Sequence, residues 1–391
     1  MNSVRWLVLF LIYAISARNY GIAESDQDNS AQTKSFTVIK GGLLDLSVNG
    51  GDITIVPWEK NEVFFRVRGI EEEQFKQLEM TSDGRTVEIN GYGGGWSGDS
   101  RIEVNVPASF RINVKTNFGA IDIRGPLSGT VKATTSAGDV HVGEIHGSVK
   151  VRTSGGNIQV GDVEGDTDLK TSGGDVSVGN VSATAEIRTA GGNVVLSNVR
   201  GSLSVKSSGG DVRVRDVGVR AEIVTLGGNI SLGRVGGGTS LSTAGGDIDL
   251  QQARGVVTAS TGGGNIRLFD VAGSIMATTG GGDILAELTP GRTGSTMVVA
   301  GSGKIRLMLP EDAKATIEAR IYMSDDWDYD RETYGIRSDF PYKGYLKYSE
   351  KKERRMALLL NGGGQKVTLQ TVDADIEIRK MGERKKHADE E

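Results

Sequence analysis

Hydrophobic and polar residues alternate along this chain in short runs, and the runs recur at a fixed interval. The clearest marker is an Asp or Asn that follows a glycine and precedes a Val or Ile. Such an interval predicts a structure built from repeated units. Nine of these markers follow one another at a constant interval of 18 positions: Asp139, Asn157, Asp175, Asn193, Asp211, Asn229, Asp247, Asn265 and Asp283.

Each 18-residue copy contains two alternating segments separated by turn residues. In the copy that begins at Gly174, Val176 and Val178 form the first apolar pair, and Ala185 and Ile187 form the second. Alternation with period two places such pairs on one face of a β-strand. One copy buries too little apolar surface to fold alone, so copies must stack. We therefore predict an all-β fold, a single-stranded parallel β-solenoid or β-helix of 18-residue coils, which is regular over residues 118–309.

The nine Asp and Asn residues alternate strictly, and stacking would align them about 4.8 Å apart. A column of carboxylates alone would repel itself, whereas an interposed amide doubles the distance between charges and adds a donor. We interpret the nine as a structural ladder and not as a metal site. The preceding glycines indicate either a positive φ or a close backbone approach. A Thr or Ser recurs fifteen residues after the glycine that precedes each marker, as Thr171 does after Gly156, and it can bond to the backbone or to its neighbours.

Three other architectures with related periods fit less well. A left-handed hexapeptide helix needs an apolar residue every six positions, but counting from Val181 reaches Asn193. Calcium-binding nonapeptides carry paired glycines and acids in both halves of an 18-residue coil, and the second half lacks them here. A pectinase-like helix surrounds its sugar with long loops, for which eight successive intervals of 18 leave no room between residues 138 and 282.

Residues 1–23 have the pattern of a secretory signal peptide. Arg5 precedes an apolar run from Trp6 to Ile15, which is too short to span a bilayer, and small residues follow. An uncleaved anchor is the alternative. We expect an exported protein that is periplasmic, surface-associated or secreted, and not integral to the membrane after cleavage. The chain has no cysteine, so it lacks an acylation site and disulfides.

The remaining divisions of the chain follow from changes in composition. We predict a polar linker over 24–35, opening coils of the solenoid over 36–117, an aromatic and acidic insertion or cap over 310–360, a closing coil over 361–380 and a charged tail over 381–391. The formal net charge is -5. Without a basic excess, we expect no nucleic-acid partner.

Several phrases resemble the bacterial DUF4097 family, which carries the label "putative adhesin". They are LLDLSVNGGDITIVPWEKNEVFFRVRG at residues 43–69, the passage from RIEVNVPASF at 101 to AGDV at 140, and the later phrases GSGKIRLMLPEDAKATIEA and NGGGQKVTLQTVDADIEIRK. The resemblance covers roughly residues 36–380. It implies an exported β-solenoid with no established enzymatic activity, and it supplies no catalytic, cofactor or metal residues.

Residues 310–360 interrupt the period and concentrate aromatic side chains. Eight of the 22 aromatic residues lie between Tyr322 and Tyr348. The segment is expected either to cap the exposed edge of the last coil or to bind a glycan or a protein, with aromatics stacking on sugars. The candidate ligand or partner surface consists of Trp327, Tyr329, Tyr334, Tyr342 and Tyr345 with Asp326 and Asp328.

Stacking would also align four cations, which are Arg152, Lys170, Arg188 and Lys206. This column is either a stripe for an anionic glycan or lipid head group, or a surface neutralised by Asp168, Glu186 and Glu222 in the adjacent column.

We predict a non-enzymatic structural, adhesion or interaction module of the bacterial cell envelope, without a cofactor, whose partner is an envelope glycan or a protein surface. The oligomeric state stays open. The alternative is a carbohydrate-active enzyme of parallel β-helix type, a polysaccharide lyase or hydrolase, and a cleft lined by three or more carboxylates would favour it.

Overall fold

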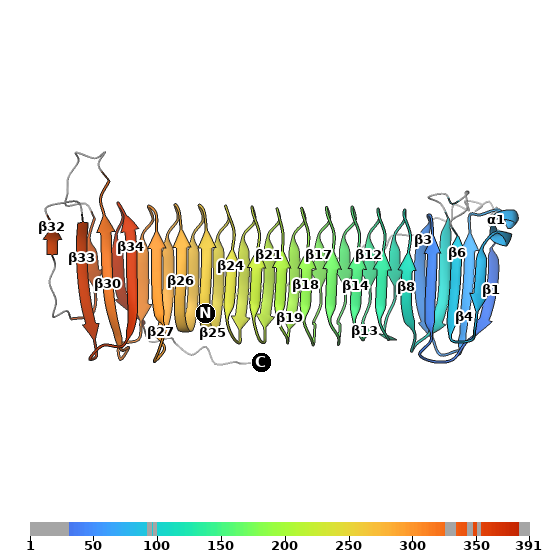
Figure 1. The fold of residues 1–391 in the computed structure, drawn as a ribbon, viewed down its shortest axis with the longest axis horizontal. Helices are drawn as coiled ribbons and strands as arrows, with labels where there is room; N and C mark the ends of the chain where they lie inside the picture. Colours follow the sequence, from blue (N-terminus) through green and yellow to red (C-terminus); the bar gives the residue numbers. More distant parts are fainter. Residues whose placement is uncertain are drawn as a thin grey trace, which may run out of the picture.

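The computed structural model describes residues 31–91, 96, 100–324, 334–341, 347–349 and 353–382. These residues form a long rod of stacked β-strands with one short helix at the N-terminal end (Figure 1). The predicted signal peptide and residues 383–391 of the predicted tail lie outside the described residues. Among the described residues, no helix is both long enough and apolar enough to cross a membrane.

The middle of the rod is a parallel β-solenoid whose coils have the length that the period predicts. Val140 pairs with Ile158, Ile158 with Val176, and Val176 with Val194, each time in the same position of the next coil. Two faces run along the rod, and a third, narrower side lies between them. On this side, isolated bridges such as Val163 to Val181 link successive coils. The all-β, mostly parallel fold is therefore confirmed.

Face A contains the second apolar segment of each coil. Its strands in this region are β11 (Val131–Thr134), β14 (Val149–Arg152), β16 (Thr167–Lys170), β18 (Ala185–Arg188), β20 (Leu203–Lys206), β22 (Ala221–Val224) and β24 (Thr239–Ser242). Face B contains the first apolar segment. Its strands are β12 (Val140–Val142), β15 (Ile158–Val160), β17 (Val176–Val178), β19 (Val194–Val199), β21 (Val212–Val217) and β23 (Ile230–Val235).

A few strands lie outside this two-face pattern. On the narrow side, β10 (Leu127–Ser128) pairs in parallel with β13 (Ile145–His146). Towards the C-terminus, β25 (Ile248–Thr261) and β26 (Ile266–Thr279) are long enough to bend around from face B to face A.

The core is a set of apolar columns inside the coils. Val176, Val178, Ala185 and Ile187 are all at most 3% exposed. Because alternation turns every second side chain outward, residues such as Glu186 stay at the surface. Each buried side chain lies on its counterpart in the next coil, so adjacent coils complete each other's core.

At the N-terminal end, the order of coils in space differs from their order in the chain. Strand β2 (Leu43–Val48) lies between β6 (Thr86–Gly91) and β8 (Arg111–Lys115), so that Leu44 pairs with Ile112 from much later in the sequence. On face B, β3 (Asp52–Trp58) lies between β7 (Arg101–Pro107) and β9 (Ile121–Ile123). The first coil, which contains β2 and β3, therefore lies inside the rod. The strands formed by residues 59–107 lie on its outer side, at the N-terminal end.

Antiparallel strands and a helix cover this end of the rod. They are β1 (Gln32–Thr37) on β4 (Glu62–Arg68), β4 on β7, β5 (Glu79–Ser82) on β6, and α1 (Glu72–Lys76). The ring of Phe75 in α1 stacks on that of Phe65, with centroids 6.5 Å apart. Because β1 begins at Gln32, residues 32–35 belong to the sheet and not to a polar linker. This edge strand is held by backbone pairing to β4 and is mostly exposed, so its sequence lacks apolar alternation.

The C-terminal end repeats the same arrangement. Strands β34 (Gln365–Val372) and β35 (Ile376–Lys380) pair with β28 (Ser295–Ala300) and β29 (Ile305–Leu309), although the whole 310–360 segment separates the two pairs in the chain. Strand β27 (Ile284–Pro290) joins this region to β26. The predicted closing coil is therefore not the last layer of the rod.

Residues from the 310–360 segment lie outside that coil. Strand β30 (Ala315–Tyr322) covers β34, and β33 (Glu353–Leu360) pairs antiparallel with β30 (Figure 1). On face B, β31 (Ile336–Ser338) pairs with β35, while β32 (Lys347–Ser349) extends the edge of face A. The segment thus covers the final coil of the rod.

Candidate functional site

Most of the predicted aromatic surface lies outside the described residues. This holds for Trp327, Tyr329, Tyr342, Tyr345, Asp326 and Asp328. Tyr334 is described, half-buried and packed against the core. The backbone carbonyl of Tyr334 also accepts a hydrogen bond from Arg354. Tyr334 thus contributes to packing of the end layer, and the binding role of the surface stays a prediction.

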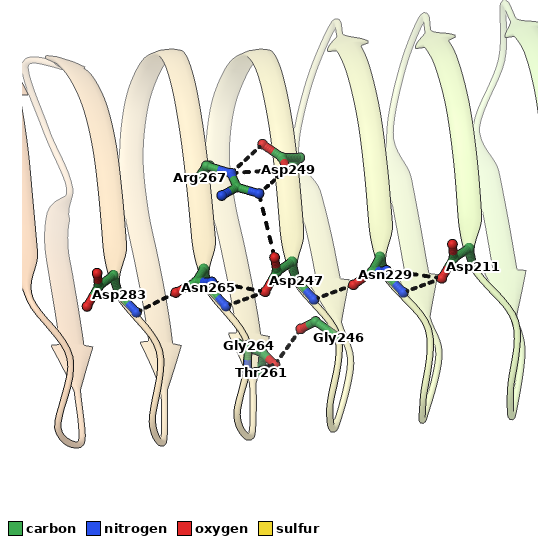
Figure 2. A network of polar contacts seen from close by, with 10 residues as sticks. All are labelled: Asp211, Asn229, Gly246, Asp247, Asp249, Thr261, Gly264, Asn265, Arg267 and Asp283. Carbon is green, nitrogen blue, oxygen red and sulfur yellow. Dashed lines mark hydrogen bonds and ion pairs between the residues drawn. The ribbon is translucent and has the colours of Figure 1, made fainter.

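The predicted Asp/Asn ladder is a continuous chain of hydrogen bonds between coils. The side-chain oxygen of each residue accepts the backbone N–H of the next residue in the ladder, and Figure 2 shows this from Asp211 to Asp283. The N···O distances lie between 2.7 and 2.9 Å along the column. The last member, Asp283, accepts from the backbone N–H of Lys304 at 2.8 Å.

This geometry explains why both Asp and Asn occur in the ladder. A carboxylate and an amide each offer an oxygen to the next N–H, so either residue serves. The amide additionally donates towards the preceding carboxylate, as Asn265 does to Asp247 at 3.3 Å. The ladder oxygens are therefore engaged by the protein's own backbone, which supports a structural role.

The glycine before each ladder residue from Asn157 to Asp283 is required by close approach and not by a positive φ, whereas Gly138, before Asp139, has both a close approach and a φ of 137°. A Cβ on Gly174 would lie 2.1 Å from the carbonyl oxygen of Gly156 in the previous coil. The same clash occurs at each such glycine from Gly156 to Gly282, and none of them has a φ in the left-handed region. The first glycine of the phrase has more space, since a Cβ on Gly173 would be 3.6 Å from the nearest atom.

The threonine column ties neighbouring corners together. The hydroxyl of Thr171 donates to the carbonyl of Gly156 at 2.9 Å and accepts from the N–H of Gly174 at 3.2 Å. These hydroxyls are buried, and Thr153, Thr243, Thr261 and Thr279 make the same pair of bonds. The hydroxyls therefore bond to the backbone, which is one of the two expected alternatives.

A second polar ladder, which the sequence analysis missed, runs along the narrow side. The N–H of Asn180 bonds to Asp162 at 2.7 Å, and the amide of Asn198 bonds to Asn180 at 2.7 Å. Further along, Arg234 bonds to Asp216 through its backbone and its guanidinium. A polar residue recurs six residues after the glycine that precedes each ladder residue, as Asn180 does after Gly174. This recurrence was the sequence signal for the second ladder.

A side groove of about 320 Å³ lies beside this second ladder, and three carboxylates line it. They are Glu144, Asp162 and Glu164, and Arg200 also lines the groove. The backbone N–H of Asn180 lowers the pKa of Asp162, which keeps that carboxylate ionised. His146 lies between the two glutamates, 2.9 Å from Glu164 and 3.6 Å from Glu144, and the bond to Glu164 raises the pKa of His146.

The four predicted cations form one column on face A. Arg152 pairs with Lys170, Lys170 with Arg188, and Arg188 with Lys206 across adjacent strands. We call these four residues the cation column. Arg152 forms an ion pair with Asp168 at 3.3 Å, and Arg188 forms one with Glu186. Neutralisation by the adjacent column is therefore only partial, because the described residues place no ion pair on Lys170 or Lys206.

A larger groove of about 630 Å³ lies beside the cation column on face A, and we call it the face groove. Its lining includes the hydroxyl residues Thr130, Ser148 and Thr184. The charged residues of the lining are Lys132, Lys150, Asp166, Asp168 and Glu186. The groove crosses four successive coils and therefore runs along the rod.

Neither groove contains a candidate metal centre. Within the part of the chain that the structure describes, no group of three or more His, Cys, Asp or Glu side chains is arranged to hold a metal ion. The two grooves and the cation column are therefore candidate binding surfaces made of side chains alone.

Comparison with known proteins gives a family match over most of the chain. The model of the family described as "Toastrack DUF4097" matches residues 43–252 and 202–379. No curated protein matches the chain.

Solved structures with similar chains share little sequence with this one. A "putative cell adhesion protein" from Clostridium sporogenes is 8% identical, with 90% of this chain and 100% of that chain covered and a TM-score of 0.20. A "putative adhesin" from Bacteroides fragilis is 11% identical, with coverage of 90% and 98% and a TM-score of 0.21. A "putative lipid binding protein" from Parabacteroides distasonis is 16% identical, with coverage of 71% and 97% and a TM-score of 0.24.

Proposed function

Because this chain belongs to the Toastrack DUF4097 family, we propose that it is a non-enzymatic, adhesion-like module of the bacterial cell envelope. It is exported and lies in the periplasm, on the cell surface or outside the cell. The observation that carries this proposal is the strict register of outward side chains on face A. A rod with a cation at the same position of four successive coils offers repeated contacts to a repetitive partner such as an envelope glycan.

The side groove supports a second candidate function. Three carboxylates around one groove are the feature expected of a carbohydrate-active enzyme of parallel β-helix type, and the face groove shares this feature through Asp166, Asp168 and Glu186. Such an enzyme needs a general acid that is protonated near neutral pH, which requires a raised carboxyl pKa. The pKa of Asp162 is instead lowered by hydrogen bonds from Asn180. This difference favours the binding module over the enzyme.

Adhesion to whole cells and isolated envelopes tests the proposed function. Fluorescently labelled protein lacking residues 1–30 would be incubated with intact bacterial cells and with envelope polysaccharide immobilised on beads. We expect retention on at least one of these surfaces and no change in the length of the polysaccharide. The same protein unfolded by heat is the control. Failure of the folded protein to bind any surface would contradict the proposal.

A further inference from the structure

The face groove has sugar-compatible hydrogen-bonding groups and lies in a positively charged part of face A. The outward side chains of strands β11, β14, β16, β18 and β20 include two acids, Asp168 and Glu186, and Asp166, just before β16, is a third acid that lines the groove. They also include six cations, which are Lys132, Lys150, Arg152, Lys170, Arg188 and Lys206. This part of face A is therefore positively charged, although the whole chain has a net charge of -5.

Some of these cations are engaged by the protein and others are not. Asp168 accepts ion pairs from both Lys150, at 3.0 Å, and Arg152, at 3.3 Å. Among the described residues, Lys132 and Lys170 make no ion pair, and both are exposed. Lys132 lines one end of the face groove, and Lys170 lies on β16 beside it. Two cations next to one groove thus remain available to a ligand.

One oxygen at the face groove, Asp168 Oδ1, is buried and has no hydrogen-bond partner among the described residues. Thr167 Oγ1 has none either, but Thr167 lies in the inward column of Val149 and Ala185 and faces the core. Buried polar atoms usually have a partner, so Asp168 Oδ1 suits a ligand that brings its own hydroxyl groups.

We propose that the face groove and the cation column beside it bind an acidic polysaccharide that lies along the rod axis. This inference rests on the proposed function and assigns it a ligand class. Carboxylates of the polymer face Lys132 and Lys170, while its hydroxyls bond to Asp168 and to the hydroxyl residues Thr130, Ser148 and Thr184. Because coils are stacked about 4.8 Å apart, the groove presents these groups repeatedly to an extended chain.

The mixture of charges on face A favours a polymer over a membrane. A bilayer of anionic lipid is uniformly negative, so it would also meet Asp168 and Glu186 and be repelled there. A thread-like sugar polymer can place its charges at the lysines and its hydroxyls at the acids. Stacking of nucleic-acid bases requires aromatic side chains, and the described residues that line the face groove include none.

Affinity for polygalacturonate, an unbranched polymer of uronic acid, tests this inference. The protein would be titrated in low salt with polygalacturonate, with neutral dextran, and with vesicles of phosphatidylglycerol and phosphatidylcholine. We expect binding to polygalacturonate alone, and at least tenfold weaker binding on raising the salt from about 50 to 200 mM, because the contacts are ionic.

Paired lysine variants locate the site. Lys132→Ser with Lys170→Ser should weaken polygalacturonate binding at least tenfold. Lys314→Ser with Lys366→Ser removes the same charge from exposed positions remote from the groove, and should change the affinity less than twofold. Equal losses in the two double variants would overturn the assignment, as would binding to vesicles without binding to polygalacturonate.

Two outcomes separate this inference from the proposed function. If the protein adheres to cells but binds dextran as well as polygalacturonate, the proposed function stands and this inference fails. If it adheres to nothing, the proposed function itself fails.

Discussion

At the scale of single residues, the repeat is maintained by backbone contacts that tolerate very few side chains. The two glycines of each phrase differ in this respect. Gly174 approaches the carbonyl of Gly156, whereas the corner at Gly173 is open. The first copy already carries Ala137 where later copies have the first glycine. The second glycine is therefore the one that the fold requires.

This difference predicts unequal effects of the same substitution at neighbouring positions. Gly174→Ala should lower the free energy of unfolding by at least about 2 kcal/mol, because its Cβ would overlap a backbone oxygen that cannot move alone. Gly173→Ala should stay within about 1 kcal/mol of the wild type. Urea unfolding measures both, and equal destabilisation would contradict the geometric account.

The alternation of Asp and Asn predicts a pH-dependent effect. Changing Asn157, Asn193 and Asn229 together to Asp keeps every ladder hydrogen bond, because a carboxylate oxygen accepts an N–H as an amide oxygen does. It also places carboxylates in succession, at a cost of about 1 kcal/mol per neighbouring pair in water. The melting temperature should therefore fall more at pH 7 than at pH 4.

A reversed triple variant is the control for that experiment. Changing Asp175, Asp211 and Asp247 together to Asn preserves the ladder hydrogen bonds and removes charge. Its melting temperature should depend less on pH than that of the wild type. An equal loss at pH 7 and pH 4 in the Asn-to-Asp variant would refute the electrostatic interpretation of the alternation.

The contacts of Glu377 predict acid sensitivity at the C-terminal end of the rod. Its side chain is 6% exposed and contacts Lys304 at 2.6 Å and Arg306 at 2.9 Å. These contacts lower the pKa of Glu377 from 4.5 to about 2. A lowered pKa stabilises the folded state above pH 4.5, and this contribution is lost as the pH falls from 4.5 towards 2.

Glu377→Gln should therefore be less stable than the wild type by about 2 kcal/mol at pH 7, and the difference should disappear near pH 2. Denaturant unfolding at several pH values measures this dependence. A difference that stays constant between pH 7 and pH 2 would show that the ion pairs of Glu377 contribute no net stability.

At the scale of strands and coils, the sequence predicts what repeats and misses what does not. The constant period sufficed to predict the coil, its inward columns and the register of the cation column. It could not predict that β2 and β34 lie inside the rod, because each pairs with a strand far away in the chain and such a pairing leaves no local signal. The partners of each lysine were also unpredictable, since they depend on side-chain conformations across columns.

The antiparallel strands at the ends predict the behaviour of a truncated protein. Strand β1 covers the edge of β4, whose residues Val63, Phe65 and Val67 are buried. A protein lacking residues 1–37 should expose that edge and self-associate with increasing concentration, because an uncovered strand edge pairs with other chains. Light scattering would compare it with a protein lacking residues 1–30. Identical masses at all concentrations would contradict a protective role of β1.

At the scale of the whole molecule, stacked coils make a rod whose corners and face A have different roles. The corner ladders and the threonine column use their polar groups to hold coils together. Face A has exposed lysines and a groove beside them, so it is the surface that a ligand can reach. The side groove is the competing site, because it gathers carboxylates and a histidine paired with one of them.

Binding without cleavage is the central claim for the whole rod, and one chromatographic measurement tests it. The protein would be incubated with polygalacturonate of uniform length at low salt and then separated by size, with the protein and the length of the polymer followed in the same fractions. We predict that the polymer elutes with the protein and keeps its length. Shortened polymer, or full-length polymer that never elutes with the protein, would contradict the account.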